Sequence, residues 1–267
     1  MKLQTFDFSG EQFSASTEEH VAILEVSGDV KKLAQDFAVR ETFFSLLEIF
    51  ETDPSLHCLL IISDQDALGQ VRYEEFWSQI FGPQEGIAAG QVTSQDRALL
   101  TAAREESALI QVCRAFSSSK KLIIVAADGS VVGPYFGAML AADFRIATNR
   151  LVVEFPHIKM GMTPLGAIAY YLPRYVGPSL ARDNLLFGAP LPATRAHELG
   201  LFDSIVAVDE YRESSLALAR RAANIPRSVV RYTKELLQLE WDHFDEFVNW
   251  ESNHIRLDKV FRSDLEA

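Results

Sequence analysis

Three short runs of apolar residues, separated by helical patterns, constrain most strongly what this chain of 267 residues can fold into. The runs are Val21–Val26, His57–Ile62 and Leu122–Ala126, and each is short and bounded by turn-forming residues. Between the first two, apolar residues recur with a helical period from Phe37 to Phe50 and stop at Asp53-Pro54. A strand, a helix and a buried strand in this order predict a parallel sheet with crossover helices.

The third run begins a longer pattern of strand, turn, helix and second strand. The turn is expected at Asp128-Gly129, the helix near Gly133-Pro134, and the second strand ends at Ala147. Proline is favourable at the first helical position because an N–H there would have no helical partner. A long helix is expected upstream, from about Ser94 to about Phe116. Residues 67–90 show no regular pattern, and we expect a mobile loop that contributes to a site.

Beyond Pro164 the pattern becomes mostly helical. Prolines fall where helices begin or break, which helps to place their ends. The predicted helices span residues 166–175, 179–187, 193–199, 210–223 and 228–241. We therefore divide the chain into an α/β body over residues 1–177 and an α-helical C-terminal region over residues 178–267.

Composition narrows the classes of partner and the cellular location. A net charge of −12 argues against nucleic acid or an anionic membrane as the main partner. Cys58 and Cys113 are too few for a disulfide framework, and we expect buried thiols in a reducing cytoplasm. The histidines show no metal-ligand spacing, so no metal is expected. The residues Met1-Lys-Leu-Gln-Thr-Phe-Asp-Phe show no h-region of a signal peptide, and no apolar run approaches the ~18 residues of a membrane span. A soluble, cytoplasmic protein is expected.

Several motifs follow one another with nearly unbroken spacing. They are Ala142-Asp143-Phe-Arg-Ile-Ala147, Phe155-Pro156-His157-Ile-Lys-Met-Gly161-Met-Thr-Pro164, Leu172-Pro-Arg-Tyr-Val-Gly177 and Ala193-Thr-Arg-Ala-His-Glu-Leu-Gly-Leu-Phe-Asp-Ser-Ile-Val206. Together they resemble the crotonase superfamily, the enoyl-CoA hydratase/isomerase family. The resemblance extends over most of the chain, from about Val21, and is most specific over residues 133–206.

The resemblance implies a fold, a ligand and an assembly. The fold is a ββα-spiral α/β core over residues 1–177, followed by a helical region of the trimerisation type over residues 178–267. The ligand is an acyl thioester of coenzyme A or of an acyl-carrier protein, with no permanently bound cofactor. The assembly is a homotrimer or a dimer of trimers.

The family's enolate chemistry needs two N–H groups that hold the negative charge of the thioester oxygen. The resemblance places one donor at Pro134, which has no N–H to give, so Gly133 or Tyr135 must replace it or the donor is missing. It places the other at Leu68, in a segment that continues with Gly69. Gly69 and Gly133 are accordingly expected to border the substrate.

Hydratases of this family use two glutamates to activate water and deliver a proton. The resemblance places them at Gly137 and His157, so neither carboxylate is present. His157 could exchange a proton near neutral pH, whereas a lone histidine is more often structural. Tyr135 offers a hydroxyl, although an aromatic residue there is more often a packing residue. Glu154 faces away from the next residue along an extended strand, and we expect a solvated charge.

Three hypotheses for the function follow from these residues. The first is an acyl-thioester-binding protein without hydratase chemistry, a pseudoenzyme, because the glutamates, the donor at Pro134 and the family's basic C-terminal segment after Arg262 are not found. The second is an active decarboxylase, isomerase or hydrolase of acyl thioesters that uses His157. The third is an ordinary enoyl-CoA hydratase, a lyase.

Overall fold

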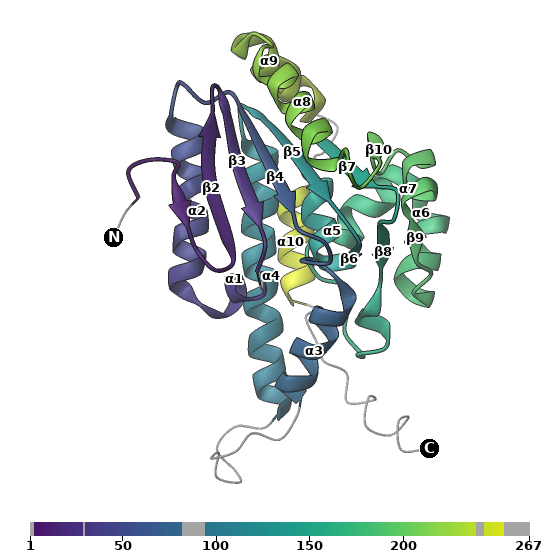
Figure 1. The fold of residues 1–267 in the computed structure, drawn as a ribbon. Coiled ribbons are helices and arrows are strands. Elements are labelled where there is room, and N and C mark those ends of the chain that lie inside the picture. The colour runs from purple at the N-terminus through teal and green to yellow at the C-terminus, as the bar shows by residue number, and fades with distance from the viewer. Residues whose placement is uncertain (1–2, 29, 82–93, 239–242, 254–267) are drawn as a thin grey trace, which may run out of the picture.

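The computed structural model describes residues 3–28, 30–81, 94–238 and 243–253 (Figure 1). Its main sheet has seven strands in the order β1-β2-β3-β4-β5-β7-β10. These strands are β1 (Phe8–Ser9), β2 (Phe13–Glu18), β3 (Val21–Val26), β4 (Cys58–Ser63), β5 (Leu122–Ala127), β7 (Phe144–Thr148) and β10 (Ser204–Val206). From β3 to β10 every neighbouring pair is parallel, as predicted, and the first three strands form an antiparallel meander.

The register of the central strands gives the sheet two buried faces. Cys58 of β4 lies between Val21 of β3 and Leu122 of β5. Successive side chains on a strand point to opposite faces, so a strand that is apolar throughout must be covered on both sides. Leu24 belongs to the core on one face and Ile23 to the core on the other. Cys58 and Cys113 are buried thiols, as predicted.

Different helices cover the two faces. Helices α2 (Phe37–Thr52) and α4 (Ser94–Ser118) lie behind the sheet in Figure 1 and contribute to the larger core. Helix α8 (Tyr211–Ala223) covers the other face, where Tyr211 donates a hydrogen bond to the carbonyl of Ser63 over 3.1 Å. The helices predicted upstream of residue 164 at 37–50, 94–116 and 133 onward are confirmed.

Residues 67–90 were expected to form a mobile loop, and for their first half this was wrong. The chain forms helix α3 (Gln70–Phe81) there, after strand β4; the short helix α1 (Lys32–Gln35) precedes α2. Tyr73, Phe76 and Trp77 are buried on α3, at the spacing of one helical face. The polar residues around these three made the short helical period difficult to recognise in the sequence. The rest of that stretch, residues 82–90, lies outside the described residues.

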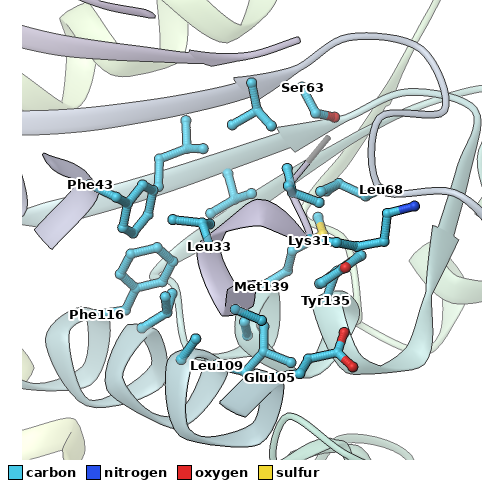
Figure 2. A pocket seen from close by; sticks show the side chains of 18 of the residues that line it. Lys31, Leu33, Phe43, Ser63, Leu68, Glu105, Leu109, Phe116, Tyr135 and Met139 are labelled. Carbon is cyan, nitrogen blue, oxygen red and sulfur yellow. The ribbon is translucent and has the colours of Figure 1, made fainter. Parts of the chain in front are cut away.

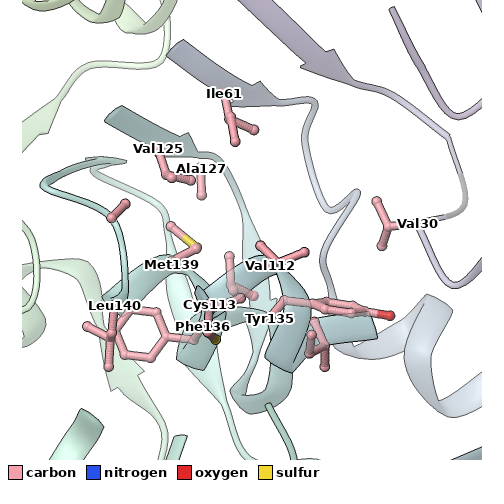
Figure 3. Close-up of a cluster of buried hydrophobic side chains, with 14 of the residues drawn as sticks. Val30, Ile61, Val112, Cys113, Val125, Ala127, Tyr135, Phe136, Met139 and Leu140 are labelled. Atoms are coloured by element: carbon pink, nitrogen blue, oxygen red, sulfur yellow. The ribbon is translucent and has the colours of Figure 1, made fainter. Parts of the chain in front are cut away.

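A smaller sheet, in the order β6-β8-β9, lies beside the main sheet and positions helix α5 (Gly133–Leu140). Its strands are β6 (Ser130–Val132), β8 (Val152–Glu154) and β9 (Leu191–Pro192), and the short 3-10 helix η1 (Pro156–Ile158) follows β8. All eight residues of α5 are buried. Figure 3 shows side chains of this helix, including Tyr135, Phe136 and Met139, among buried residues of β4, β5 and α4.

The C-terminal part is mainly helical, as predicted, with two short strands that join the sheets. Its helices are α6 (Ile168–Phe187), α7 (Ala193–Glu198), α8, α9 (Arg227–Gln238) and α10 (Phe244–Asn253). The two helices predicted at 166–175 and 179–187 form the single element α6, which is kinked where Gly177 has non-helical φ and ψ of 79° and 160°. Helix α10 was not predicted, and the expected end of α9 at residue 241 lies outside the described residues. The division at residue 177 stays a prediction.

None of the helices described, up to Asn253, is long and apolar enough to cross a membrane.

Candidate active site

An apolar pocket of about 110 Å³ lies between the main sheet and helices α1, α2, α4 and α5 (Figure 2). Phe43 of α2 and Phe116 of α4 lie together at one end of the view, and Lys31, Tyr135 and Leu68 lie at the other. Aliphatic side chains from β4, β5, α4 and α5 line the space between them. Such a pocket can bind a short hydrocarbon, since an apolar cavity of about 150 Å³ binds benzene.

Glu105 is the charged residue of α4 that lines this pocket. Its side chain is 3% exposed, and its Oε2 accepts a hydrogen bond from the hydroxyl of Tyr73 at 3.2 Å. Burial raises the pKa of Glu105 to about 8, and the bond from Tyr73 opposes this rise. This carboxyl group at one end of an apolar pocket is thus mostly protonated at pH 7 and half-ionised near pH 8.

The first turn of α5 lies beside the segment that contains Leu68. The carbonyl of Leu68 accepts a hydrogen bond from Val132 N at 2.9 Å, and Gly69 N donates to the carbonyl of Asp66 at 3.0 Å. An α-helix leaves the amides of its first turn without helical acceptors. In α5 those amides belong to Gly133 and Tyr135, because Pro134 has none. The structure therefore brings the predicted donor position Leu68 next to the two possible replacements for Pro134.

Gly137 lies on a face of α5 that has no room for a side chain. A Cβ atom at this position would lie 2.1 Å from the carbonyl oxygen of Gly166 and 2.8 Å from Ile168 N. Gly166 itself has φ of +73°, and a Cβ atom there would lie 2.3 Å from the carbonyl oxygen of Pro134. The backbone around Gly166 thus packs directly on the face of α5 that holds both Pro134 and Gly137.

The buried carboxyl group of Glu106 and the partly buried carboxyl group of Glu251 hold this backbone in place. Glu106 of α4 accepts a hydrogen bond from Gly166 N at 2.7 Å, and Glu251 of α10 accepts one from Ala167 N at 3.2 Å. A hydrogen bond also joins the two carboxyl groups, which requires a proton between them. Burial, followed by this bond, raises the pKa of Glu251, so the pair holds its proton at neutral pH.

His157 does not line the pocket. It is 3% exposed on η1, and its Nε2 lies 3.0 Å from the carbonyl oxygen of Leu185, which can only accept a hydrogen bond. Burial lowers the pKa of His157, and the bond to Leu185 opposes this, so the ring is neutral at physiological pH. The geometry gives His157 a structural contact with α6 and does not bring it to Tyr135 or Leu68.

The other residues named from the sequence are Tyr135, Gly69 and Glu154. Tyr135 lines the pocket, and its ring lies 5.8 Å from that of Tyr73 at nearly a right angle. Gly69 packs beside Ser130, whose hydroxyl accepts a hydrogen bond from Gln70 N at 2.9 Å. The expectation that Glu154 is a solvated charge was wrong, because it is half-buried and accepts a hydrogen bond from the Ser130 hydroxyl.

Sequence reasoning missed the buried acids of α4, although a signal was present. Ala98, Ala102, Leu109 and Cys113 are buried and mark the inner face of this helix. Glu105 falls on that same face by spacing, three residues after Ala102 and four before Leu109. A charged residue on the apolar face of a long helix is uncommon unless it is hydrogen-bonded, so its position alone marked it for attention.

The matching family model is described as enoyl-CoA hydratase/isomerase and spans residues 87–253, more than half of the sequence. The chain belongs to this family. A probable enoyl-CoA hydratase of Mycobacterium tuberculosis is 27% identical over 229 residues, covering 84% of this chain and 80% of the relative. A short-chain-enoyl-CoA hydratase of Clostridioides difficile is 34% identical over 122 residues, covering 46% of this chain and 78% of the relative.

Solved structures show the same fold. An enoyl-CoA hydratase/isomerase from Pseudoalteromonas atlantica has a TM-score of 0.69 at 20% identity, with 96% of both chains covered. An enoyl-CoA hydratase from Bacillus anthracis has a TM-score of 0.70 at 17% identity, with 91% of this chain and 89% of that chain covered. The predicted crotonase-like fold is therefore confirmed for this family member.

Proposed function

We propose that this protein binds a short acyl thioester, with the acyl group in the apolar pocket, and that it does not hydrate enoyl thioesters with a pair of glutamates. The observation behind the second part is the contact at Gly137. A glutamate cannot occupy a position whose Cβ would lie 2.1 Å from the Gly166 carbonyl oxygen without displacing that backbone. Membership in the enoyl-CoA hydratase/isomerase family supports an acyl-CoA ligand.

The pocket supports an acyl group of a few carbons. Its lining is almost entirely hydrocarbon, and each buried methylene contributes about 0.8 kcal/mol, a factor of about four in affinity. Leu68, whose N–H is the donor expected for the thioester oxygen, lines one end of this pocket. Coenzyme A is then part of the ligand, and it is not a permanently bound cofactor.

Titration calorimetry with free coenzyme A, acetyl-CoA, butyryl-CoA and hexanoyl-CoA tests this proposal. We expect the dissociation constant to fall about fourfold per added methylene until the pocket is full. Ala108 of α4 lines the pocket, so Ala108→Leu should abolish the gain beyond acetyl-CoA. Ala103→Leu makes the same change on the exposed side of α4 and should leave the titration unchanged. Equal affinities for all four ligands would contradict the proposal.

The same titration with an acyl-carrier protein bearing a butyryl group tests the alternative carrier. Tighter binding of the carrier thioester than of butyryl-CoA would assign the ligand to carrier proteins. A crotonyl-CoA hydration assay, followed by loss of the conjugated thioester absorbance, tests the chemistry. Hydration by the wild type at rates typical of enzymes, about 1 per second or faster, would overturn the second part of the proposal.

The alternative enzyme, a decarboxylase, isomerase or hydrolase that uses His157, is tested separately. The side chain would have to leave the carbonyl of Leu185 to reach a ligand in this pocket. Turnover of malonyl-, enoyl- and acyl-CoA substrates by wild type and His157→Asn decides the point. Loss of a measured turnover in the variant at unchanged thermal stability would favour this alternative.

The proposed assembly is a homotrimer or dimer of trimers in the cytoplasm. Its support is a set of exposed apolar side chains on α9 and α10, where Leu236, Leu237 and Trp250 are 68%, 64% and 69% exposed. Light scattering on the purified protein should give three or six times the mass of 29.9 kDa. A monomeric mass would remove this part of the proposal.

A further inference from the structure

Glu105 and Glu106 are adjacent buried acids of α4 with different surroundings. Glu106 points to the backbone at Gly166 and is bonded to Glu251. Glu105 lines the apolar pocket together with Tyr135 and Leu68 (Figure 2). Glu106 therefore holds backbone, whereas Glu105 lines the space that the proposed function assigns to the acyl group.

Two tyrosines hold the Glu105 carboxyl at the wall of the pocket. Oε2 accepts the bond from Tyr73 at 3.2 Å, and Tyr135 also forms a hydrogen bond to this side chain. A carboxylate has about four lone-pair sites, so a carboxylate that accepts these two bonds can still take up a proton.

The surroundings also keep both protonation states of Glu105 accessible. Burial raises its pKa to about 8, the Tyr73 bond lowers it, and the Glu106 charge raises it. Tyr135 of α5 and Lys31, which precedes α1, both favour the ionised form. A group with a pKa near the working pH can take up a proton and return it, which is the condition for general acid–base catalysis.

We propose that Glu105 is the catalytic acid–base residue of this pocket and exchanges a proton with the carbon next to the thioester carbonyl of the bound acyl group. The carboxylate takes the proton from carbon, and the C–H electron pair shifts to form an enolate with its negative charge on the thioester oxygen. The carboxylic acid then returns a proton to carbon, so atoms and charge balance without a further reactant.

The enolate oxygen needs N–H donors. Leu68 lines the same pocket as Glu105, and Gly133 and Tyr135 lie in the first turn of α5, where backbone amides point out of the end of the helix. The inference rests on the proposed binding of an acyl thioester. The inference names Glu105 as the residue that acts on the ligand. Glu105 is at neither of the family's two glutamate positions, which fall at Gly137 and His157.

The test is deuterium exchange at the acyl α-carbon of butyryl-CoA in D2O, measured by mass spectrometry. Butyryl-CoA binding is titrated in parallel with the same proteins. We expect wild type to catalyse exchange and Glu105→Gln to lose at least a hundredfold in rate while binding stays within about threefold. Glu105→Asp, which keeps a displaced carboxyl, should recover part of the rate.

Glu106→Gln is the matched control, because this neighbour is equally buried and faces the Gly166 backbone. Above pH 8, where Glu105 is ionised in both proteins, its exchange rate should stay within about threefold of wild type. The wild-type rate should rise with pH and level off above about 8, as Glu105 ionises, and the residual rate of Glu105→Gln should lack this step. Thermal unfolding of each variant identifies losses caused by misfolding.

The outcomes separate the inference from the proposed function. Binding of butyryl-CoA by wild type without exchange, or exchange that survives in Glu105→Gln, overturns the inference and leaves the binding function standing. Failure of wild type to bind butyryl-CoA overturns both. A full loss in Glu106→Gln equal to that in Glu105→Gln would also overturn the assignment.

Discussion

The contact between Gly137 and Gly166 leads to a prediction about stability. In Gly137→Ala, the new Cβ would lie 2.1 Å from the Gly166 carbonyl oxygen, far inside the 3.4 Å at which ordinary contacts begin. The obstructing atoms are backbone, held by Glu106 and Glu251, and cannot rotate away as a flexible side chain would. The segment at Gly166 must therefore shift.

The cost can be worked from two opposing effects. Overpacking of this kind costs up to about 3 kcal/mol. Alanine in place of glycine inside a helix returns about 1 kcal/mol. The net expected loss in the free energy of unfolding of Gly137→Ala is about 2 kcal/mol, which corresponds to a fall of about 4–8 °C in Tm for a chain of this size.

Urea denaturation followed by circular dichroism, with a thermal melt in parallel, measures this loss. Gly133→Ala is the control on the same helix, because the nearest atom to its Cβ would be a ring carbon of Phe155 at 3.3 Å. We expect that variant to lie within about 1 kcal/mol of wild type. A Gly137→Ala protein as stable as wild type would refute the close packing at this site. So would a stable Gly137→Glu protein that hydrates crotonyl-CoA.

Three further predictions concern groups away from the pocket. Lys234 donates to Asp143 at 2.8 Å in a largely buried pair, so Lys234→Met should lower the free energy of unfolding, measured by urea denaturation, by about 3 kcal/mol. Arg195→Met breaks an exposed pair with Glu198 and should lower it by less than about 0.5 kcal/mol. Equal losses in the two variants would contradict the reasoning. Because the pKa of Glu251 is raised in the folded state, the unfolded chain loses this proton first as pH rises, and stability should fall from about pH 5 upward by at most about 1.4 kcal/mol per unit. Glu251→Gln should flatten this fall between pH 6 and 9, and an unchanged slope would argue against the shared proton. Finally, Tyr211→Phe removes a buried bond to the Ser63 carbonyl and should cost about 1 kcal/mol without changing acyl-CoA affinity; a changed affinity would show that α8 influences the pocket.

The parallel sheet and its crossover helices were predictable because local pattern and burial agree there. The runs at Val21–Val26 and Leu122–Ala126 are almost entirely apolar, and a strand that is covered on both faces fits such a run. The helix that begins at Gly133-Pro134 was predictable for a similar reason, since proline suits a first helical turn.

Helix α3 and the buried acids were not predictable by the same rules. The three large residues of α3 become buried through contacts with distant elements, such as the bond between Tyr73 and Glu105. The lack of space at Gly137 depends on Gly166, which is far along the chain, and no local pattern shows it. Contacts across long sequence separations decide the chemistry of this site.

The structure of the protein with 2-oxopentyl-CoA, a non-hydrolysable thioether in which a ketone keeps the butyryl oxygen, tests the central claim most directly. The account predicts the butyryl chain among Leu109, Val112 and Met139, with its first carbons beside Glu105 and the oxygen-bearing end within hydrogen-bonding distance of Leu68 N. A butyryl group bound outside this pocket, for instance between α5 and His157, would contradict it.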